Sequence, residues 1–231
     1  MIPVRYALTG GVATVTMDDG KANALSPAML AAVNDALDRA EKDDVAAAVL
    51  AGRPGRFSAG FDLNVLRVGG TEAEAMVRGG FELAERLLGF PRPVVVACTG
   101  HAMAMGSFLL CAADHRVGAA GDFKIQANEV ALGITMPYSG LALLRYRLTP
   151  AAFDRAVGLS ALFTPATAIA AGWLDEVVDA DAVVSAAQSI ASSFDGLDPA
   201  AHAATTRRAR AGVLADVRRG IESSTSELAS T

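Results

Sequence analysis

The stretch Val94–Phe108, which reads VVVACTGHAMAMGSF, decides the fold that the sequence predicts. Its first five residues, Val94–Cys98, are apolar without interruption, as in a strand that is buried on both faces. Thr99 and Gly100 then turn the chain, and a helix is expected near Gly106–Ala113. A buried strand that leads into a helix is typical of folds in which helices pack on a largely parallel sheet.

The same order of elements occurs upstream of this stretch. Val45–Ala51 is a second short apolar run, which indicates another buried strand. Residues Glu72–Leu88 have helical spacing, and Pro91 and Pro93 end that helix before the next strand begins. Strand and helix therefore alternate along the chain, which predicts the α/β class.

The N-terminal part predicts a hairpin followed by a helix. Gly10-Gly11 indicates a turn between Val4–Leu8 and the alternating strand Val12–Met17. Ser26-Pro27 is a helix start signal, because serine is a favoured N-cap and proline at the first helical position lacks a donor that would be unpaired anyway. Apolar residues at helical spacing follow it, at Leu30, Val33, Leu37 and Ala40.

The C-terminal part is predicted to be helical. Thr149-Pro150, Thr164-Pro165 and Asp198-Pro199 repeat the combination of a capping residue and a proline. The helix that starts at Asp198-Pro199 is expected to run through Arg210, and Asp181–Phe194 is expected to form another helix.

Composition excludes several classes of protein. The 231 residues are 52% hydrophobic and 19% charged, which excludes a disordered chain and suits one core of ordinary size. No apolar run reaches the length of about 18 residues that a membrane-spanning helix needs. The N-terminus shows no long apolar segment of a secretory signal, so a cytoplasmic location is expected. The net charge of −5 offers no electrostatic basis for binding nucleic acid.

The residue types that usually bind metals are not grouped in the sequence. His115 and His202 lack ligand-like neighbours, so no metal site is predicted and no cofactor is expected. Cys98 and Cys111 lie inside apolar runs, which indicates small buried thiols.

Three segments carry residues suited to a binding or catalytic site. Ser58-Ala59-Gly60-Phe61-Asp62-Leu63 follows a buried strand, and its small residues let the backbone approach a ligand. Gly100–Phe108 leads into a helix, whose N-terminal N–H groups point outward and can stabilise an anion without a charged side chain. Glu129, within Asn128–Ile134, lies beside an apolar stretch, where desolvation would raise its pKa and suit it to acid–base catalysis.

Together these segments resemble the crotonase superfamily, also called the enoyl-CoA hydratase/isomerase family. Its members carry an S/A-A-G-x-D-L segment, then a G-x-A-x-G-G-G loop that enters a helix, then a P-E-x-x-L-G-like segment. The matching residues are, in the same order, Ser58–Leu63, Gly100–Gly106 and Glu129–Gly133. Ala22–Ser26 resembles the family's early N-A-L segment, and Ala168–Val178 resembles its A-x-x-x-G-L-V-D-x-V segment.

The resemblance implies a crotonase-like spiral of repeated β-β-α turns over residues 1–180. Residues 181–231 would then form a C-terminal helical region that covers the pocket and makes oligomer contacts. A homotrimer or homohexamer is expected, with an acyl-CoA thioester as the substrate and with neither nucleic acid nor membrane as a partner.

The resemblance also implies an oxyanion hole, made by two backbone N–H groups that bind the thioester oxygen. Carried over residue by residue, these groups fall at Phe61 and Met105. Preorganised donors of this kind favour the charge of an enolate more than the neutral thioester. The other residues expected to line the thioester and CoA site are Ser58, Ala59, Gly60, Asp62, Leu63, Ala104, Gly106 and Phe108.

One departure from the family pattern decides between two chemistries. Hydratases of the family use two glutamates, and the first of them falls at Phe108, which cannot transfer a proton. Isomerisation of a 3-enoyl to a 2-enoyl thioester needs a single base, so the sequence favours isomerase-like chemistry with Glu129 as the proton shuttle. An enoyl-CoA hydratase and a non-catalytic acyl-CoA-binding protein remain the alternatives.

Two further departures concern ligand contacts. Met105 stands where the family commonly has glycine, and Asn64 stands where it often has a lysine near the CoA phosphates. Other basic residues would then anchor the nucleotide, and the candidates are Arg56, Arg67, Arg207 and Arg208.

Overall fold

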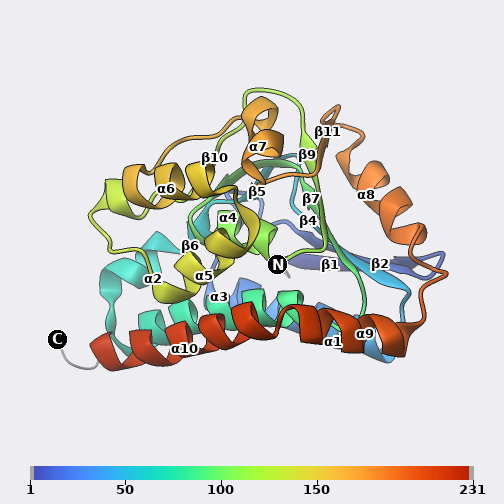
Figure 1. Ribbon diagram of the computed structural model, residues 1–231, viewed down its shortest axis with the longest axis horizontal. Helices are drawn as coiled ribbons and strands as arrows, with labels where there is room; N and C mark the ends of the chain where they lie inside the picture. Colours follow the sequence, from blue (N-terminus) through green and yellow to red (C-terminus); the bar gives the residue numbers. More distant parts are fainter. Residues whose placement is uncertain (1–2, 229–231) are drawn as a thin grey trace.

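The computed structural model describes residues 3–228, which form a mixed α/β fold (Figure 1). Its main sheet has six strands in the spatial order β1-β2-β4-β7-β9-β11. β1 (Val4–Thr9) and β2 (Val12–Met17) form the hairpin predicted around Gly10-Gly11, with Val4 opposite Met17. All other pairings within this sheet are parallel, so the predicted α/β class is confirmed.

The central strands of the main sheet are the apolar runs that the sequence predicted. β4 (Ala47–Ala51) and β7 (Val94–Cys98) pair with each other, and each of their residues is buried. The remaining strands are β9 (His115–Ala119) and β11 (Glu176–Val178), which extend the sheet beyond β7. Because both faces of β4 and β7 are covered, their sequences do not alternate between apolar and polar side chains.

A second set of short strands runs beside the main sheet. β5 (Gly55–Ser58), β8 (Gly100–Met103) and β10 (Ile125–Gln126) form a parallel sheet in the order β10-β8-β5. β3 (Ala24–Leu25) and β6 (Gly60–Phe61) form another parallel pair. Successive turns of the chain thus give one strand to the main sheet and a second strand to a small sheet before a helix, which is the predicted β-β-α spiral.

The helices surround this arrangement on two sides. Their bounds are α1 (Pro27–Lys42), α2 (Leu63–Val68), α3 (Gly70–Leu88), α4 (Met105–Cys111), the short 3-10 helix η1 (Val130–Leu132), α5 (Tyr138–Arg147), α6 (Pro150–Leu159), α7 (Pro165–Ala171), α8 (Val183–Ser192), α9 (Pro199–Ala209) and α10 (Ala211–Leu228). The larger apolar core lies between one face of the sheet and helices that include α1, α3 and α4. A smaller apolar cluster lies between the other face and α8. None of the helices among the residues described here is both long and apolar enough to cross a membrane.

The start of α1 follows the predicted capping pattern. The Ser26 side chain accepts a hydrogen bond from the Met29 N–H at 3.2 Å, and Pro27 occupies the first helical position. The predicted apolar residues of α1 all face the core, and they are Leu30, Val33, Leu37 and Ala40.

One expected feature of the local structure is corrected, and one short helix was not predicted. The chain does not pass from Thr99-Gly100 directly into a helix, because Gly100–Met103 first forms the strand β8. Only Gly100 and Ala102 of this strand are buried, so it lacks the apolar run that identified β7. The segment Leu63–Val68 forms the short helix α2, whose residues are all partly or fully exposed, so no apolar face marks it in the sequence.

The helix predicted from Asp198-Pro199 through Arg210 is α9, and it is followed by a further helix, α10, that the sequence did not predict. α9 ends at Ala209 and α10 begins at Ala211, because Arg210 turns inward at the junction. Its guanidinium donates to the Leu88 carbonyl oxygen at 2.8 Å and pairs with the Asp114 carboxylate. Asp114 also accepts the Val94 N–H at 2.7 Å. This buried pair ties the last helices to the start of β7.

We predict that Asp114→Ala lowers the free energy of unfolding by about 3 kcal/mol, because it leaves the buried Arg210 guanidinium without its carboxylate. Urea unfolding at pH 7 measures the change. The matched control is Asp216→Ala, which removes an exposed pair with Arg219 and is expected to cost about 0.5 kcal/mol or less. Equal losses in the two variants would contradict the assignment.

Candidate active site

The loop that leaves β5 is held by a buried serine. The Ser58 hydroxyl donates to the Asn23 carbonyl oxygen at 2.8 Å and accepts the Gly60 N–H at 3.2 Å. Ser58 has no exposed surface. The two bonds fix the path of the backbone on its way to Phe61.

Asn23 supports the same loop. In the sequence it stands out only as part of the segment Ala22–Ser26. Its side-chain amide donates to the carbonyl oxygens of Met17 at 2.9 Å and of Arg56 and Phe57 at 3.2 Å each. Its backbone has φ of 51°, a conformation that asparagine tolerates better than most residues. Asn23 therefore joins three segments, and nothing in the local sequence signals this long-range role.

The loop after β5 and the start of α4 approach each other closely. Gly60 has φ of 88°, and a Cβ atom placed there would lie 2.9 Å from the Ala104 Cβ and 3.3 Å from the Met105 nitrogen. A Cβ atom on Gly106 would lie 2.6 Å from the Ser58 carbonyl oxygen. Only glycine permits either contact. The segment that carries Phe61 and the segment that carries Met105 are thus in backbone contact.

The turn into α4 is held in an uncommon conformation. Ala104 has φ of 47° and ψ of −126°, which a residue with a Cβ atom rarely adopts. Its N–H donates to the Gln126 carbonyl oxygen at 2.9 Å, and its own carbonyl oxygen accepts from the Ser107 hydroxyl at 2.7 Å. Met105 follows as the first helical residue, where a helix provides no intrahelical acceptor for the N–H.

An aromatic cluster packs beside this turn. The rings of Phe81 and Phe108 are stacked with centroids 5.9 Å apart, and Phe61 meets Phe81 edge-on at 6.4 Å. Two glycines make room for these rings: a Cβ atom on Gly80 would lie 2.4 Å from the Phe61 ring, and one on Gly140 would lie 3.2 Å from the Phe108 ring. Phe108, which is 1% exposed, is thus packed among aromatic rings at the position where hydratases of the crotonase superfamily carry an acid.

Glu129 lies at the start of η1, three residues after Gln126. Since the Gln126 carbonyl oxygen accepts the Ala104 N–H, the chain length between them places the Glu129 Cα within about 10 Å of the Gln126 Cα. Glu129 is 7% exposed, and its Oε2 atom is buried without a hydrogen-bond partner. Burial raises the pKa of this carboxyl from 4.5 to about 7, against a smaller opposing effect of a hydrogen bond with its own backbone. The fold therefore keeps a buried carboxyl with one unpartnered oxygen three residues beyond the strand residue that holds the start of α4.

The other predicted contact residues lie farther along the same loop. Asp62 caps α2 by accepting the Asn64 N–H at 2.8 Å, and Leu63 is 61% exposed. Arg56 lies on β5 and Arg67 on α2, so both candidates for phosphate binding belong to the elements that flank Ser58–Leu63. Ala59, the remaining predicted residue of this stretch, is exposed.

The remaining two phosphate candidates are not brought to this region. Arg207 and Arg208 lie on α9, which is at the opposite end of the molecule from α2 (Figure 1). The backbone N–H of Lys124 donates to the His101 ring nitrogen Nδ1 at 3.0 Å, and the sequence did not indicate this contact. His101 is therefore a hydrogen-bonded residue of β8, and its ring also meets the Phe123 ring edge-on at 5.4 Å.

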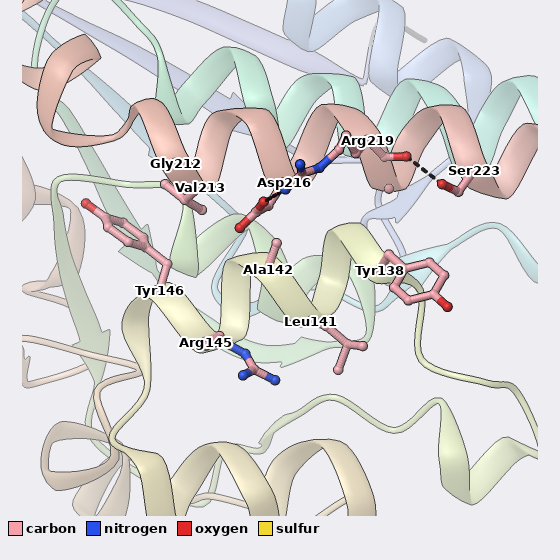
Figure 2. Close-up of a pocket in the computed structure, with 11 residues that line it drawn as sticks. Tyr138, Leu141, Ala142, Arg145, Tyr146, Gly212, Val213, Asp216, Arg219 and Ser223 are labelled. Atoms are coloured by element: carbon pink, nitrogen blue, oxygen red, sulfur yellow. Dashed lines mark hydrogen bonds and ion pairs between the residues drawn. The ribbon is translucent and has the colours of Figure 1, made fainter.

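A separate hollow of about 680 Å³ lies between α5 and α10 (Figure 2). Its lining residues come from the outer face of α5, for example Tyr138, Leu141 and Arg145, and from α10. The buried face of the same helix includes Gly140, which meets Phe108. The hollow is thus separated from Phe108 by the thickness of α5, and none of the predicted site residues lines it.

Metal ligation finds no support in the part of the chain that the structure describes. Among residues 3–228, no three side chains of histidine, cysteine, aspartate or glutamate gather in a way that could hold a metal ion. Cys98 and Cys111 are fully buried, and burial raises the pKa of each thiol to about 12.

Comparison with known proteins agrees with this arrangement. A family model described as enoyl-CoA hydratase/isomerase matches residues 8–227. A probable enoyl-CoA hydratase of Mycobacterium avium is 36% identical over 207 residues, which are 88% of this chain and 78% of the relative. Two solved structures each have a TM-score of 0.94 and cover 98% of this chain and 99% of their own. They are an enoyl-CoA hydratase from Mycobacterium marinum at 50% identity and an enoyl-CoA isomerase from Mycobacterium tuberculosis at 51%. The chain therefore belongs to the enoyl-CoA hydratase/isomerase family, the crotonase superfamily.

Proposed function

We propose that this enzyme isomerises 3-enoyl-CoA thioesters to 2-enoyl-CoA thioesters, with Glu129 as its single proton-transfer group. The observation that carries the proposal is the pairing of two features. Glu129 is a buried carboxyl with an unpartnered oxygen, and Phe108 supplies an aromatic ring where hydratases of the family have a second acid. A single acid together with an apolar aromatic side chain suits proton transfer between two carbon atoms better than the addition of water.

The reaction needs only one group that first accepts and then donates a proton. The Glu129 carboxylate removes a proton from C2, and the electron pair of that C–H bond moves onto the thioester oxygen to give a dienolate. The electrons then return through C2 and C3 to C4, which takes the proton back from the Glu129 carboxyl. Atoms and charge balance, and neither water nor an oxidant is consumed.

The pKa of Glu129 suits both halves of this exchange. A group whose pKa is about 7 is present in both protonation states at neutral pH. An ordinary exposed glutamate, with a pKa near 4.3, would be a weaker base toward a carbon acid. Burial of the Glu129 side chain is the physical cause of the difference.

The negative charge of the dienolate needs stabilisation at the thioester oxygen, and we assign this to the N–H groups of Phe61 and Met105. Support comes from the contact at Gly60, which brings the two backbones together. Fixed backbone donors need no reorganisation as the charge develops, which is why such pairs lower the barrier strongly. Substrate contacts are proposed for the flanking residues Ser58, Ala59, Gly60, Asp62, Leu63, Ala104, Gly106 and Phe108.

We predict that Glu129→Gln lowers kcat for isomerisation of 3-hexenoyl-CoA by about 10³-fold, because general acid–base catalysis contributes on this scale. The appearance of the conjugated thioester absorbance measures the rate. The Kd for hexanoyl-CoA, a saturated and unreactive analogue, is expected to change less than about threefold. The control is Glu222→Gln, an exposed carboxylate on α10. Retained isomerase activity in Glu129→Gln would exclude Glu129 as the base.

The same substitution is expected to alter the pH dependence of stability. The folded carboxyl keeps its proton up to about pH 7, whereas the unfolded carboxyl releases it near pH 4.5. Between these values the folded state binds more protons, so the free energy of unfolding falls as the pH rises. The shift of about 2.5 units corresponds to about 3 kcal/mol.

Because glutamine does not ionise, Glu129→Gln is expected to be more stable than the native protein at pH 8, by up to about 3 kcal/mol. At pH 4 the two proteins are expected to have equal stability. Urea unfolding at both pH values tests this without reference to activity. A Gln variant that is less stable at pH 8 would show that the carboxylate is paired in the fold.

The relatives named as hydratases favour a second candidate, the addition of water to a trans-2-enoyl-CoA. Hydration needs one group to activate water and another to deliver a proton, and Phe108 does neither. We therefore expect loss of the conjugated absorbance of trans-2-hexenoyl-CoA to be at least about 100-fold slower than isomerisation under the same conditions. Comparable rates would identify the chain as a hydratase.

A further inference from the structure

We infer that Ser160 is a positioning residue for Glu129, because it forms hydrogen bonds with residues on both sides of that glutamate. The inference rests on the proposed role of Glu129 as the base. Ser160 lies at the end of α6, far from Glu129 in sequence, and it was not among the residues that the sequence pointed to.

The contacts of Ser160 straddle Glu129. Its carbonyl oxygen accepts a hydrogen bond from the Gln126 side-chain amide at 2.6 Å. Its hydroxyl accepts a hydrogen bond from the Ala131 N–H at 3.1 Å. Gln126 precedes Glu129 by three residues and Ala131 follows it by two. A single residue of another element thus holds the chain just before and just after the base.

The conformation of Ser160 argues that the hydroxyl is retained for a purpose. Ser160 has φ of 47° and ψ of 41°, which is the left-handed region that glycine adopts without strain. The described helices η1 and α7 end in the same region, and there the residues are Gly133 and Gly172. α6 is capped in the same way but carries a side chain, and that side chain is 8% exposed and bonded to Ala131.

The segment that Ser160 contacts has little else to hold it. Residues 130–135, which follow Glu129 directly, are all exposed, and Leu132 and Ile134 are 59% and 47% exposed. Within the turn, the Glu129 carbonyl oxygen accepts the N–H groups of Leu132 and Ile134 at 2.9 Å each. These bonds shape the turn but do not attach it to the rest of the molecule.

The attachment comes from the chain around Ser160. Besides the two bonds of Ser160 itself, Ile125 and Phe163 exchange backbone hydrogen bonds of 2.9 and 3.0 Å. These two bonds anchor the segment at β10, upstream of Glu129. The bond between the Ser160 hydroxyl and the Ala131 N–H anchors it downstream of Glu129. Loss of the hydroxyl is therefore expected to let the base shift while β10 stays in place.

A shift of the base alters the chemical step more than binding. The carboxyl has to reach both C2 and C4 of the substrate, and a displacement of about 1 Å at a reacting group can cost about 100-fold in rate. The segments proposed to contact acyl-CoA, Ser58–Leu63 and the start of α4, are held by hydrogen bonds that do not involve Ser160. A fall in kcat with little change in KM is thus the signature of a positioning role.

The test is Ser160→Gly in the full chain. Glycine keeps the carbonyl oxygen that accepts from Gln126, relieves the left-handed backbone and removes the hydroxyl together with its Cβ atom. The melting temperature is expected to equal or exceed that of the native enzyme, while kcat with 3-hexenoyl-CoA falls about tenfold or more and KM stays within twofold. A purely structural cap at this position would be served as well by glycine, with no loss of kcat.

Two companion variants sharpen the result. Ser160→Asn offers an amide oxygen as the acceptor, and asparagine tolerates the left-handed region, so it is expected to recover much of the lost kcat. The control is Ser193→Gly at the end of α8, whose hydroxyl bonds only within its own helix, and its kcat is expected to be unchanged.

The outcomes are distinguishable. Native kcat in Ser160→Gly, or a Ser160→Asn variant no faster than Ser160→Gly, would overturn the positioning role while leaving Glu129 as the base. Native activity in Glu129→Gln would instead overturn the proposed function, and the positioning role would fall with it.

Discussion

The close approach of two backbones, at Gly60 and at the turn of Ala104 into α4, is the constraint on which the site depends. A Cβ atom on Gly60 would lie within 3.3 Å of three atoms of the neighbouring segment. Because a side chain is excluded there, the two backbones come close enough for the oxyanion hole that we propose at Phe61 and Met105. Every other feature of the site serves to hold these two segments in place or to line the space beside them.

The supports of this contact are distributed along the chain. Asn23 and Ser58 hold the β5 loop from the N-terminal side, and the Gln126 carbonyl oxygen holds Ala104 from the C-terminal side. The stacked rings of Phe81 and Phe108 pack beside the turn into α4. Burial raises the pKa of the Glu129 carboxyl, so packing of the core also bears on the acid–base chemistry proposed for that residue.

The sequence predicted the parts of this structure that depend on local pattern. The apolar runs of β4 and β7 and the capped start of α1 can be identified because neighbouring residues determine burial and capping. The strand β8 could not be identified, since it is defined by its partners in the small sheet. Residues such as Asn23 and Ser160 act through long-range hydrogen bonds and carry no motif.

The small sheet is expected to have a lower local stability than the main sheet. The loops that carry the site leave β5, β8 and β10, which have two to four residues each, whereas the main sheet has six strands and lies between two apolar clusters. Short ladders with partly exposed strands open more readily than buried ones. We therefore expect sub-global fluctuations to separate Glu129 from the segments proposed to bind the thioester oxygen while the main sheet persists. Inactivation by mild heat or denaturant is then expected to precede melting of the main sheet, and activity is expected to return without global refolding.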